Sequence, residues 1–428
     1  MHNTGVRRVS RFKGDLSHRA LTRRRESGTL LTDPQMRYTE PISSPVRVAY
    51  VLPGLSIGGA ESQVLTLASR LDRARFSPSV VSTAGDGPLR HRLEEADVPV
   101  TVLNYPGLSL HPLRAIRLLR ETLSFFRDMT HAFREHAVSI VHAFLPGGNV
   151  LGACGAALAG IPVTIVSKRA LCNYKRGHPV FSLVEDLANV KARAVLVNSK
   201  AVALDVEANE HCWRGKIRLI YNGVGAGVHP LRLGELFPGL AGGEKHPVVT
   251  YVANFYGYKG HEDLIEAAGL VAREIPDVRF LLVGHDAGAM AEVRNQIARL
   301  GLEMHVILAG SRADAPGIFA SSTLAVHPSH QEGFPNAVLE AMAAGKAVVA
   351  AASGGTVEAV EDGRTGILVP PRNPEALAEA VLRLLRDPAR AQRMGEAGRA
   401  RVQVEFSLER MVRSYQDLYD ELLAGRLT

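Results

Sequence analysis

The sequence predicts an α/β protein built from two doubly wound parallel-sheet domains in tandem. Short strands rich in Val and Ile alternate with helical segments along most of the 428 residues. This alternation is typical of parallel sheets covered by helices on both faces. It is interrupted by the Gly- and Pro-rich stretch 226–246, which we interpret as a linker. Because ligands of such sheets bind at the carboxyl ends of the strands, two facing domains predict a binding cleft between them.

The first domain is expected over residues 45–225. Its strands are short, apolar and bounded by turn residues. They are predicted at VRVAYVL (46–52), SPSVVST (77–83), VSIVHAF (138–144), PVTIVSK (162–168), AVLVNS (194–199) and IRLIYNGV (217–224). The segment AESQVLTLASRL (60–71) has apolar residues at helical spacing, and PLRHRLEEADV (88–98) is the next predicted helix.

The second domain is expected over residues 247–405 and repeats the same alternation. Its strands are predicted at VVTYVANF (248–255), VRFLLVG (278–284), VILAG (306–310), TLAVHPS (323–329), AVVAA (347–351) and TGILVP (365–370). Helices are predicted at 261–275, 291–302 and 374–387. A last helical segment, 406–428, is expected to pack back on the first domain.

One predicted helix is apolar on every face and yet contains a carboxylate. In EGFPNAVLEAMAAGKAVVAAASGG (332–355), Asn336 is expected to cap the helix and Gly345 to end it. Such a helix should be buried, and an unpaired charge inside it is costly. Glu340 therefore pairs with a core Arg or His, or it accepts hydrogen bonds from ligand hydroxyls. A sugar or a ribose is the natural ligand.

Composition narrows the class of protein. Three cysteines without a CxxC motif argue against a secreted disulfide fold, and no apolar run approaches the ~20 residues of a membrane span. We therefore expect a cytoplasmic protein.

The net charge bears on the binding partners. A net charge of +7 allows nucleic acid, an anionic membrane surface or a phosphorylated substrate as a partner. The few aromatic residues and the lack of an RNA-binding signature argue against nucleic acid. Residues 1–44, rich in Arg, Ser and Thr, are expected to form a disordered basic tail.

Two further stretches point to a phosphate-bearing ligand. Gly58 and Gly59 lie between a strand and a helix, where glycine lets backbone N–H groups approach an anion. A simple turn is the alternative. Lys259 precedes a helix N-terminus, where a bound anion would relieve the conflict with the helix dipole. A surface lysine that bends into solvent is the alternative.

Together, these stretches resemble the signature of the retaining family 4 glycosyltransferases. Glu332 and Glu340 match that family's E-x7-E, embedded in HPSHQEGFPNAVLEAMAAGKAVVAAASGG. The segments IGGAE, VHAFLP, IYNGV, YKGHEDLIEA and LLVG occur in the family's order, so the resemblance covers about residues 46–420. It implies the GT-B fold, in which two Rossmann-like domains face each other across a cleft. The first would bind the acceptor and the second a nucleotide-sugar donor.

The resemblance also implies roles for the charged residues and the Gly pair. Glu332 would bind hydroxyls of the donor sugar, and Glu340 would bind the nucleotide ribose. Lys259 would hold the diphosphate and stabilise its charge as it leaves. Gly58 and Gly59 would approach the diphosphate from the first domain.

Four more residues follow from the same resemblance. The N–H groups of Gly333, Phe334 and Asn336 would lie near the sugar and the phosphates. His142, in VHAF, matches a histidine that contacts the donor sugar near the reacting centre in the family. An ordinary buried histidine at a strand end explains His142 equally well.

The chain departs from the family pattern at two places. Many relatives carry an Arg five or three residues before the Lys, where this chain has Asn254 and Tyr256. Asn254 stays a candidate for donor binding, but one diphosphate-neutralising cation is missing. Relatives also often read HxH where this chain has Phe144 at the second position. The candidate cations to replace the missing Arg are Lys168, Arg169 and Arg312.

The expected activity is transfer of a sugar from a nucleotide-sugar donor to a hydroxyl acceptor, with retention, in cell-surface polysaccharide or glycolipid synthesis. No D-x-D pair occurs in the chain, so we expect no metal and no cofactor, and the positive charge would come from Lys259 and helix N-termini. No carboxylate is clearly placed as a nucleophile, which favours front-face displacement. The alternatives are a nucleotide-sugar 2-epimerase and a non-catalytic nucleotide-sugar-binding protein.

The acceptor is expected to be lipid-linked or a saccharide. The stretch 110–138 interleaves Arg with Leu, Ile and Phe, and such a segment can lie on an anionic membrane surface. This reading places the protein at the inner face of the membrane as a peripheral protein. Amphipathic helices that only cover the sheet are the alternative.

Overall fold

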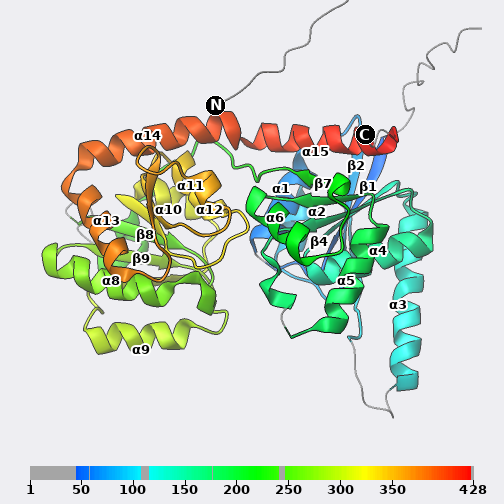
Figure 1. The fold of residues 1–428 in the computed structure, drawn as a ribbon, viewed down its shortest axis with the longest axis horizontal. Helices are drawn as coiled ribbons and strands as arrows, with labels where there is room; N and C mark the ends of the chain where they lie inside the picture. Colours follow the sequence, from blue (N-terminus) through cyan, green and yellow to red (C-terminus); the bar gives the residue numbers. More distant parts are fainter. Residues whose placement is uncertain (1–44, 57, 108–114, 176, 241–245, 426–428) are drawn as a thin grey trace, which may run out of the picture. The chain divides into compact units, whose positions relative to one another are not determined.

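The computed structural model confirms the predicted fold class. Two parallel sheets form, one of seven strands and one of six, with helices on both faces (Figure 1). The predicted basic tail lies outside the described residues, as does part of the predicted linker. The structure describes residues 45–56, 58–107, 115–175, 177–240 and 246–425.

The first sheet has the strand order β3-β2-β1-β4-β5-β6-β7. All neighbouring strands run parallel. The chain winds outward from β1 in one direction and from β4 in the other, so the switch point lies between these two strands. The strands are β1 (Val46–Leu52), β2 (Phe76–Ser82), β3 (Val100–Val102), β4 (Ile140–Phe144), β5 (Val163–Lys168), β6 (Ala194–Val197) and β7 (Ile217–Leu219).

Helices cover the first sheet in two groups. One group shares a core with Tyr50 and Phe144 and consists of α1 (Gly59–Arg70), α2 (Leu89–Glu95) and α15 (Leu408–Leu423). The other group packs on the opposite face, where α4 contacts both α3 and α5. It consists of α3 (Ala115–Glu135), α4 (Pro146–Ala159), α5 (Pro179–Lys191) and α6 (Lys200–Asn209).

The last helix, α15, packs on the first sheet although it follows the second domain in the sequence. Ser407 caps its N-terminus by accepting a hydrogen bond from the N–H of Arg410. The buried residues of α15 recur at intervals of three and four, which places one apolar stripe on the core. Inside that core, the hydroxyl of Tyr419 donates to the Tyr50 hydroxyl at 3.1 Å.

The second sheet has the order β10-β9-β8-β11-β12-β13, again with all neighbours parallel. Its switch point lies between β8 and β11, and these two strands carry the predicted donor site at their carboxyl ends. The strands are β8 (Val248–Val252), β9 (Arg279–Val283), β10 (Val306–Gly310), β11 (Leu324–His327), β12 (Val348–Ala351) and β13 (Gly366–Val369).

Helices also cover both faces of the second sheet. One face packs against α8 (His261–Glu274), α9 (Met290–Leu300) and α13 (Pro374–Arg386). The other face packs against α10 (Ala315–Ser321), α11 (Asn336–Ala343), α12 (Thr356–Ala359) and α14 (Pro388–Glu405). Helix α11 is the predicted apolar helix. Five of its residues are buried, and Gly345 follows its end with a φ of 72°.

Part of the predicted linker packs on the second sheet. Helix α7 (Leu233–Leu236) and the following turn place Leu233, Phe237 and Leu240 against Val248 and Leu281. The Gly and Pro content of this stretch conceals a short run of apolar residues, which is why the sequence predicts only a linker. Within the described residues, no helix is both long enough and apolar enough to cross a membrane.

Candidate donor-binding site

Lys259 and Glu332 meet at the switch point of the second sheet. Lys259 lies in the turn after β8, and Glu332 lies in the loop after β11. Since β8 and β11 are neighbours in the sheet, their carboxyl ends bring these residues together. The Lys259 Nζ donates to Glu332 Oε1 at 2.6 Å, and His327 Nε2 lies 2.8 Å from the same oxygen.

The charges of this group stabilise one another. Burial by itself would raise the pKa of the Glu332 carboxyl, but the charges of Lys259 and His327, and their hydrogen bonds, hold it well below its usual range. Burial likewise opposes the charge of Lys259, yet the attraction of Glu332 raises the pKa of the ammonium group above its ordinary value. Glu332 therefore stays ionised and acts as an acceptor only.

Glu340 faces a different environment. It lies in the middle of α11 and is partly exposed, and among the described residues no cation or hydrogen-bond donor contacts its carboxyl group. Burial raises the pKa of this carboxyl to about 7. Of the two explanations that the sequence leaves open, pairing with a core Arg or His is not what the structure shows. A carboxyl with free acceptor atoms fits the ligand hydroxyls of the other explanation.

The loop between β11 and α11 brings backbone groups into the site. The side chain of Phe334 packs on Tyr221 and Phe406, with ring centroids 4.9 and 5.3 Å apart, so only its backbone can reach a ligand. Gly333 is buried, and a Cβ there would lie 2.1 Å from the carbonyl oxygen of Arg169. Glycine is therefore required at Gly333 by close packing.

Asn336 does not cap α11, which corrects the prediction from the sequence. Pro335 occupies the cap position and Asn336 is the first helical residue. The Asn336 amide instead donates to the carbonyl of Gly59 at 3.3 Å, and its oxygen accepts from Asn222 Nδ2 at 2.6 Å. No side chain caps α11, so the N–H groups of its first turn stay available for an anion.

Two further glycines, Gly354 and Gly355, support this loop. The N–H of Gly355 donates to the carbonyl of Glu332 at 3.3 Å. A Cβ at Gly354 would lie 1.8 Å from the same oxygen, and a Cβ at Gly355 would lie 2.0 Å from the carbonyl oxygen of Gly333. Their signal in the sequence is the Gly pair that follows β12.

The structure brings Gly59 to Asn336, but it gives Gly58 and Asn254 more local roles. Gly58 caps α1 in an extended conformation, and a Cβ there would lie 2.4 Å from a carboxylate oxygen of Glu61. The Asn254 side chain accepts a hydrogen bond from the N–H of His285 at 3.3 Å. Contact of Gly58 and Asn254 with a donor stays a prediction.

His142 lies in the core of the first domain, away from Lys259 and Glu332. It is fully buried, and its ring nitrogens lie 2.8 Å from the Tyr419 hydroxyl and 2.7 Å from the Ser167 hydroxyl. Burial lowers its pKa well below the usual value, and Arg169 adds to the effect. Phe144 stacks on the ring at 4.4 Å between centroids. This environment favours the buried-histidine reading over contact with a donor sugar.

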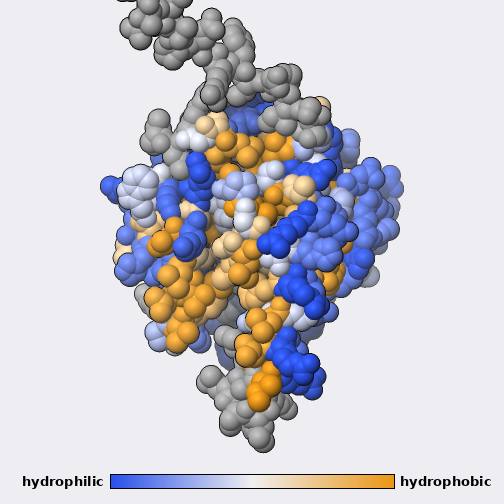
Figure 2. All heavy atoms as spheres, turned by 90° about the vertical axis from the view of Figure 1, so that its right-hand side faces the viewer, coloured by the Kyte–Doolittle hydropathy of each residue, from blue (hydrophilic) through white to orange (hydrophobic). Residues whose placement is uncertain are grey.

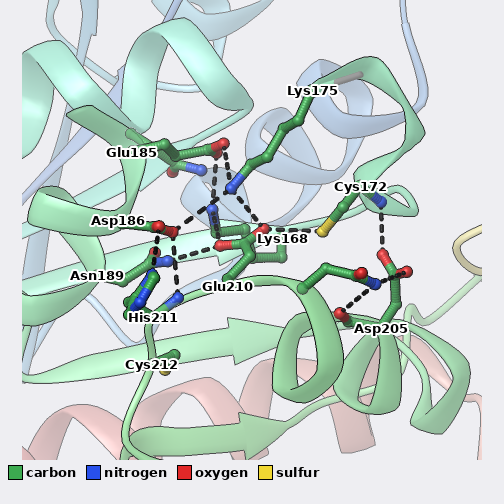
Figure 3. A network of polar contacts seen from close by, with 12 residues as sticks. Lys168, Cys172, Lys175, Glu185, Asp186, Asn189, Asp205, Glu210, His211 and Cys212 are labelled. Atoms are coloured by element: carbon green, nitrogen blue, oxygen red, sulfur yellow. Dashed lines mark hydrogen bonds and ion pairs between the residues drawn. The ribbon is translucent and has the colours of Figure 1, made fainter. Parts of the chain in front are cut away.

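The three candidate replacements for the missing Arg have different environments in the structure. Lys168 is almost fully buried and pairs with Glu185 and Glu210, both at 2.7 Å, in the network of Figure 3. Arg312 pairs with Asp314 at 2.5 Å. Lys168 is therefore not available to a diphosphate.

Arg169 is the cation that lies next to the predicted donor loop. Its guanidinium donates to the Asn222 side chain and, at 3.4 Å, to the Tyr415 hydroxyl. Asn222 in turn donates to the Phe334 carbonyl at 3.1 Å. In the described part of the chain, Arg169 forms no ion pair with a carboxylate, although its charge acts on the nearby Glu61 carboxyl.

Solved structures share this fold. Anabaena Alr3699/HepE, solved in complex with UDP-glucose, superposes with a TM-score of 0.76 at 25% sequence identity, over 88% of this chain and 99% of that chain. With its two doubly wound domains, this chain has the GT-B fold of glycosyltransferases.

Sequence comparisons then give the family. Residues 57–226 match the family described as Glycosyltransferase Family 4, and residues 235–401 match Glycosyl transferases group 1. Alpha-maltose-1-phosphate synthase of Mycobacterium tuberculosis is 30% identical over 326 residues, which are 69% of this chain and 82% of that protein. The chain belongs to glycosyltransferase family 4.

A further relative matches over a shorter stretch. N-acetyl-alpha-D-glucosaminyl L-malate synthase of Bacillus anthracis is 28% identical over 180 residues, which are 42% of this chain and 47% of that protein. The chain thus spans about half the length of this relative.

Proposed function

We propose that this protein transfers a sugar from a nucleotide-sugar donor, with UDP as the first candidate nucleotide, to a hydroxyl acceptor. One observation carries the proposal. At the switch point of the second sheet, Lys259 contacts Glu332 in the loop that leads into α11, an uncapped helix that presents the unpaired Glu340. The UDP-glucose bound by Alr3699/HepE supports the choice of nucleotide.

Each of these three residues binds a different part of the donor. Glu332 accepts hydrogen bonds from hydroxyls of the sugar, and Glu340 accepts them from the ribose. Lys259 turns from Glu332 toward the diphosphate. Lys259 and the N–H groups at the start of α11 then stabilise the negative charge that develops on the departing diphosphate.

The transfer proceeds with retention by front-face displacement. The bond between the anomeric carbon and the diphosphate oxygen breaks, and its electron pair leaves with the nucleotide diphosphate. The acceptor oxygen bonds to the anomeric carbon on the same face, and its proton passes to the departing phosphate oxygen. Glu332 is committed to Lys259 and His327, which argues against its acting as a covalent nucleophile.

The positive charge for this step comes from the protein, so we propose that turnover needs no divalent metal. The test is to measure sugar release from UDP-glucose after dialysis against EDTA, with and without added Mg²⁺ or Mn²⁺. Unchanged rates are expected. A rate that falls in EDTA and returns with metal would contradict this part of the proposal.

We further propose a lipid-linked acceptor and a peripheral position at the cytoplasmic membrane face. Helix α3 exposes Ile116, Leu119 and Leu123, at fractional exposures of 60–76%, beside Arg117 and Arg120. Figure 2, viewed from the α3 side, shows exposed apolar bands next to hydrophilic residues. Basic and apolar side chains on one helix face are typical of binding to an anionic membrane.

Helix α5 extends this apolar surface. It packs with α3 against the intervening α4, and its exposed apolar residues follow a helical spacing of three and four. They are Val180, Leu183, Leu187 and Val190.

Vesicle binding tests the membrane proposal. The wild type should sediment with vesicles that contain phosphatidylglycerol at low ionic strength and be released by salt. Leu119→Glu and Leu183→Glu should abolish sedimentation, whereas Met304→Glu, at an exposed apolar site of the second domain, should not. A wild type that stays soluble with such vesicles at low ionic strength would end this proposal.

A thermal-shift screen tests the main proposal. Sugars linked to UDP, GDP and ADP are compared at equal concentration, because a ligand of the folded state raises the melting temperature by mass action. Incubation of the best ligand without acceptor separates the alternatives, since a 2-epimerase isomerises the free donor. A protein that binds the donor, yet shows neither hydrolysis nor transfer with any acceptor pool, would be a binding protein.

A further inference from the structure

His327 is the third member of the Lys259–Glu332 group. It is the first residue of the signature HPSHQEGFPNAVLEAMAAGKAVVAAASGG, but the sequence assigns it no role. It ends β11 and is only 4% exposed. Its Nε2 lies 2.8 Å from Glu332 Oε1. Because a carboxylate only accepts hydrogen bonds, Nε2 is the donor in this contact.

The two donors hold only one oxygen of the Glu332 carboxylate. Lys259 Nζ and His327 Nε2 both contact Oε1. Among the described residues, no hydrogen bond or ion pair reaches Oε2. The second oxygen is therefore free to accept a hydrogen bond from a ligand.

Packing fixes the imidazole ring of His327. The His327 ring packs edge-on against Tyr251, with 5.6 Å between centroids. The Tyr251 hydroxyl donates to the Lys259 carbonyl at 2.7 Å, so the same ring also supports the turn that presents Lys259. His327 is further held by the pairing of its strand with β12, opposite Ala350.

Lys259 cannot hold Glu332 in place at every stage if it also binds the diphosphate. Its ammonium group now contacts Glu332 at 2.6 Å, and a bound diphosphate would attract the same group. A loop glutamate that loses its cation would gain rotamer freedom and lose its fixed direction. His327 is then the hydrogen-bond donor that remains in contact with Glu332.

We propose that His327 is the positioning residue for Glu332: it anchors Oε1, so that Oε2 keeps its direction toward the donor sugar when Lys259 turns to the diphosphate. This inference rests on the proposed function. It concerns only the sugar contact and predicts no effect on the binding of the nucleotide itself.

The test compares two ligands and two variants. UDP and the tightest-binding of UDP-glucose, UDP-galactose and UDP-N-acetylglucosamine are titrated calorimetrically into wild type, His327→Phe and His327→Gln. Phenylalanine keeps the ring but removes the donor, whereas glutamine keeps an N–H donor. A control, His305→Phe, removes a histidine that contacts a backbone carbonyl elsewhere in the second domain.

His327→Phe should weaken binding of the UDP-sugar by at least about tenfold, the value of a hydrogen bond to a charged group, and leave UDP binding within about twofold. His327→Gln should recover most of the loss, and His305→Phe should show none. In donor hydrolysis, the acid limb of the pH profile of kcat should move to higher pH in His327→Phe, because Glu332 loses a donor that favours its charged form.

The possible outcomes separate the two proposals. If His327→Phe binds the UDP-sugar and UDP with the same preference as the wild type, and its pH profile is unchanged, His327 is only a structural histidine and the inference is wrong. A wild type that prefers no UDP-sugar over UDP also removes the sugar contact and the inference with it. A wild type that binds neither ligand overturns the proposed function itself.

Discussion

Replacing Glu340 by Gln tests the site without any ligand. Burial raises the pKa of its carboxyl from 4.5 to about 7. Between pH 4.5 and pH 7, the carboxyl is therefore protonated in the folded protein and ionised in the unfolded chain. By linkage, the stabilising contribution of this proton is complete below pH 4.5 and is lost as the pH rises through 7. The shift is about 2.5 pH units, so at about 1.4 kcal/mol for each unit the cost of ionising this carboxyl above pH 7 is at most about 3.5 kcal/mol.

The neutral amide of Glu340→Gln does not ionise. The variant should lie within about 1 kcal/mol of the wild type at pH 5 and exceed its stability at pH 8 by up to about 3.5 kcal/mol. Urea unfolding followed by far-UV circular dichroism at the two pH values measures this, with the exposed Glu303→Gln as control. An equal stability difference at pH 5 and pH 8 would refute the reasoning, because it would mean that the Glu340 carboxyl is solvated or paired.

Three other predictions concern the site and its supports. Lys259→Ala should lower the rate of sugar release by about 10²–10³-fold, as expected for removal of a donor to the developing charge, while retaining some UDP binding in calorimetry. Gly354→Ala should lower the melting temperature and weaken UDP-sugar binding, because a Cβ there meets a carbonyl oxygen at 1.8 Å. The control Gly363→Ala, at a φ of 74° with open space around it, should show only the smaller cost of backbone strain. Equal effects of the two substitutions would contradict the packing argument. Lys168→Met should reduce the free energy of unfolding by about 3–5 kcal/mol, because it leaves buried carboxylates without one of their cations; a change below about 1 kcal/mol in urea unfolding would contradict this.

The strands of both sheets are largely predictable from the sequence because residues buried on both faces read as continuous apolar runs. The exceptions have physical reasons. Strand β3 has three residues, all only partly buried, and forms an edge of its sheet. Helix α7 has four residues inside a Gly- and Pro-rich stretch, too few for a periodic pattern to appear.

The candidate site is predictable only where local sequence determines the chemistry. Lys259 and Glu332 follow strands that are neighbours at a switch point, so their contact follows from the topology. The environment of His142 does not follow from the topology, because its partner Tyr419 lies 277 residues away in the sequence. The same holds for Lys168, whose partners come from α5 and the end of α6.

The central claim is that Glu340 binds the ribose of a nucleotide in the second domain. Calorimetric titration of UDP and 2′,3′-dideoxy-UDP into the wild type and Glu340→Ala tests it most directly. The wild type should bind UDP at least about tenfold more tightly than the dideoxy analogue, since the analogue lacks hydrogen bonds to a charged group, and the variant should bind both alike. The same preference for UDP in both proteins would contradict the claim.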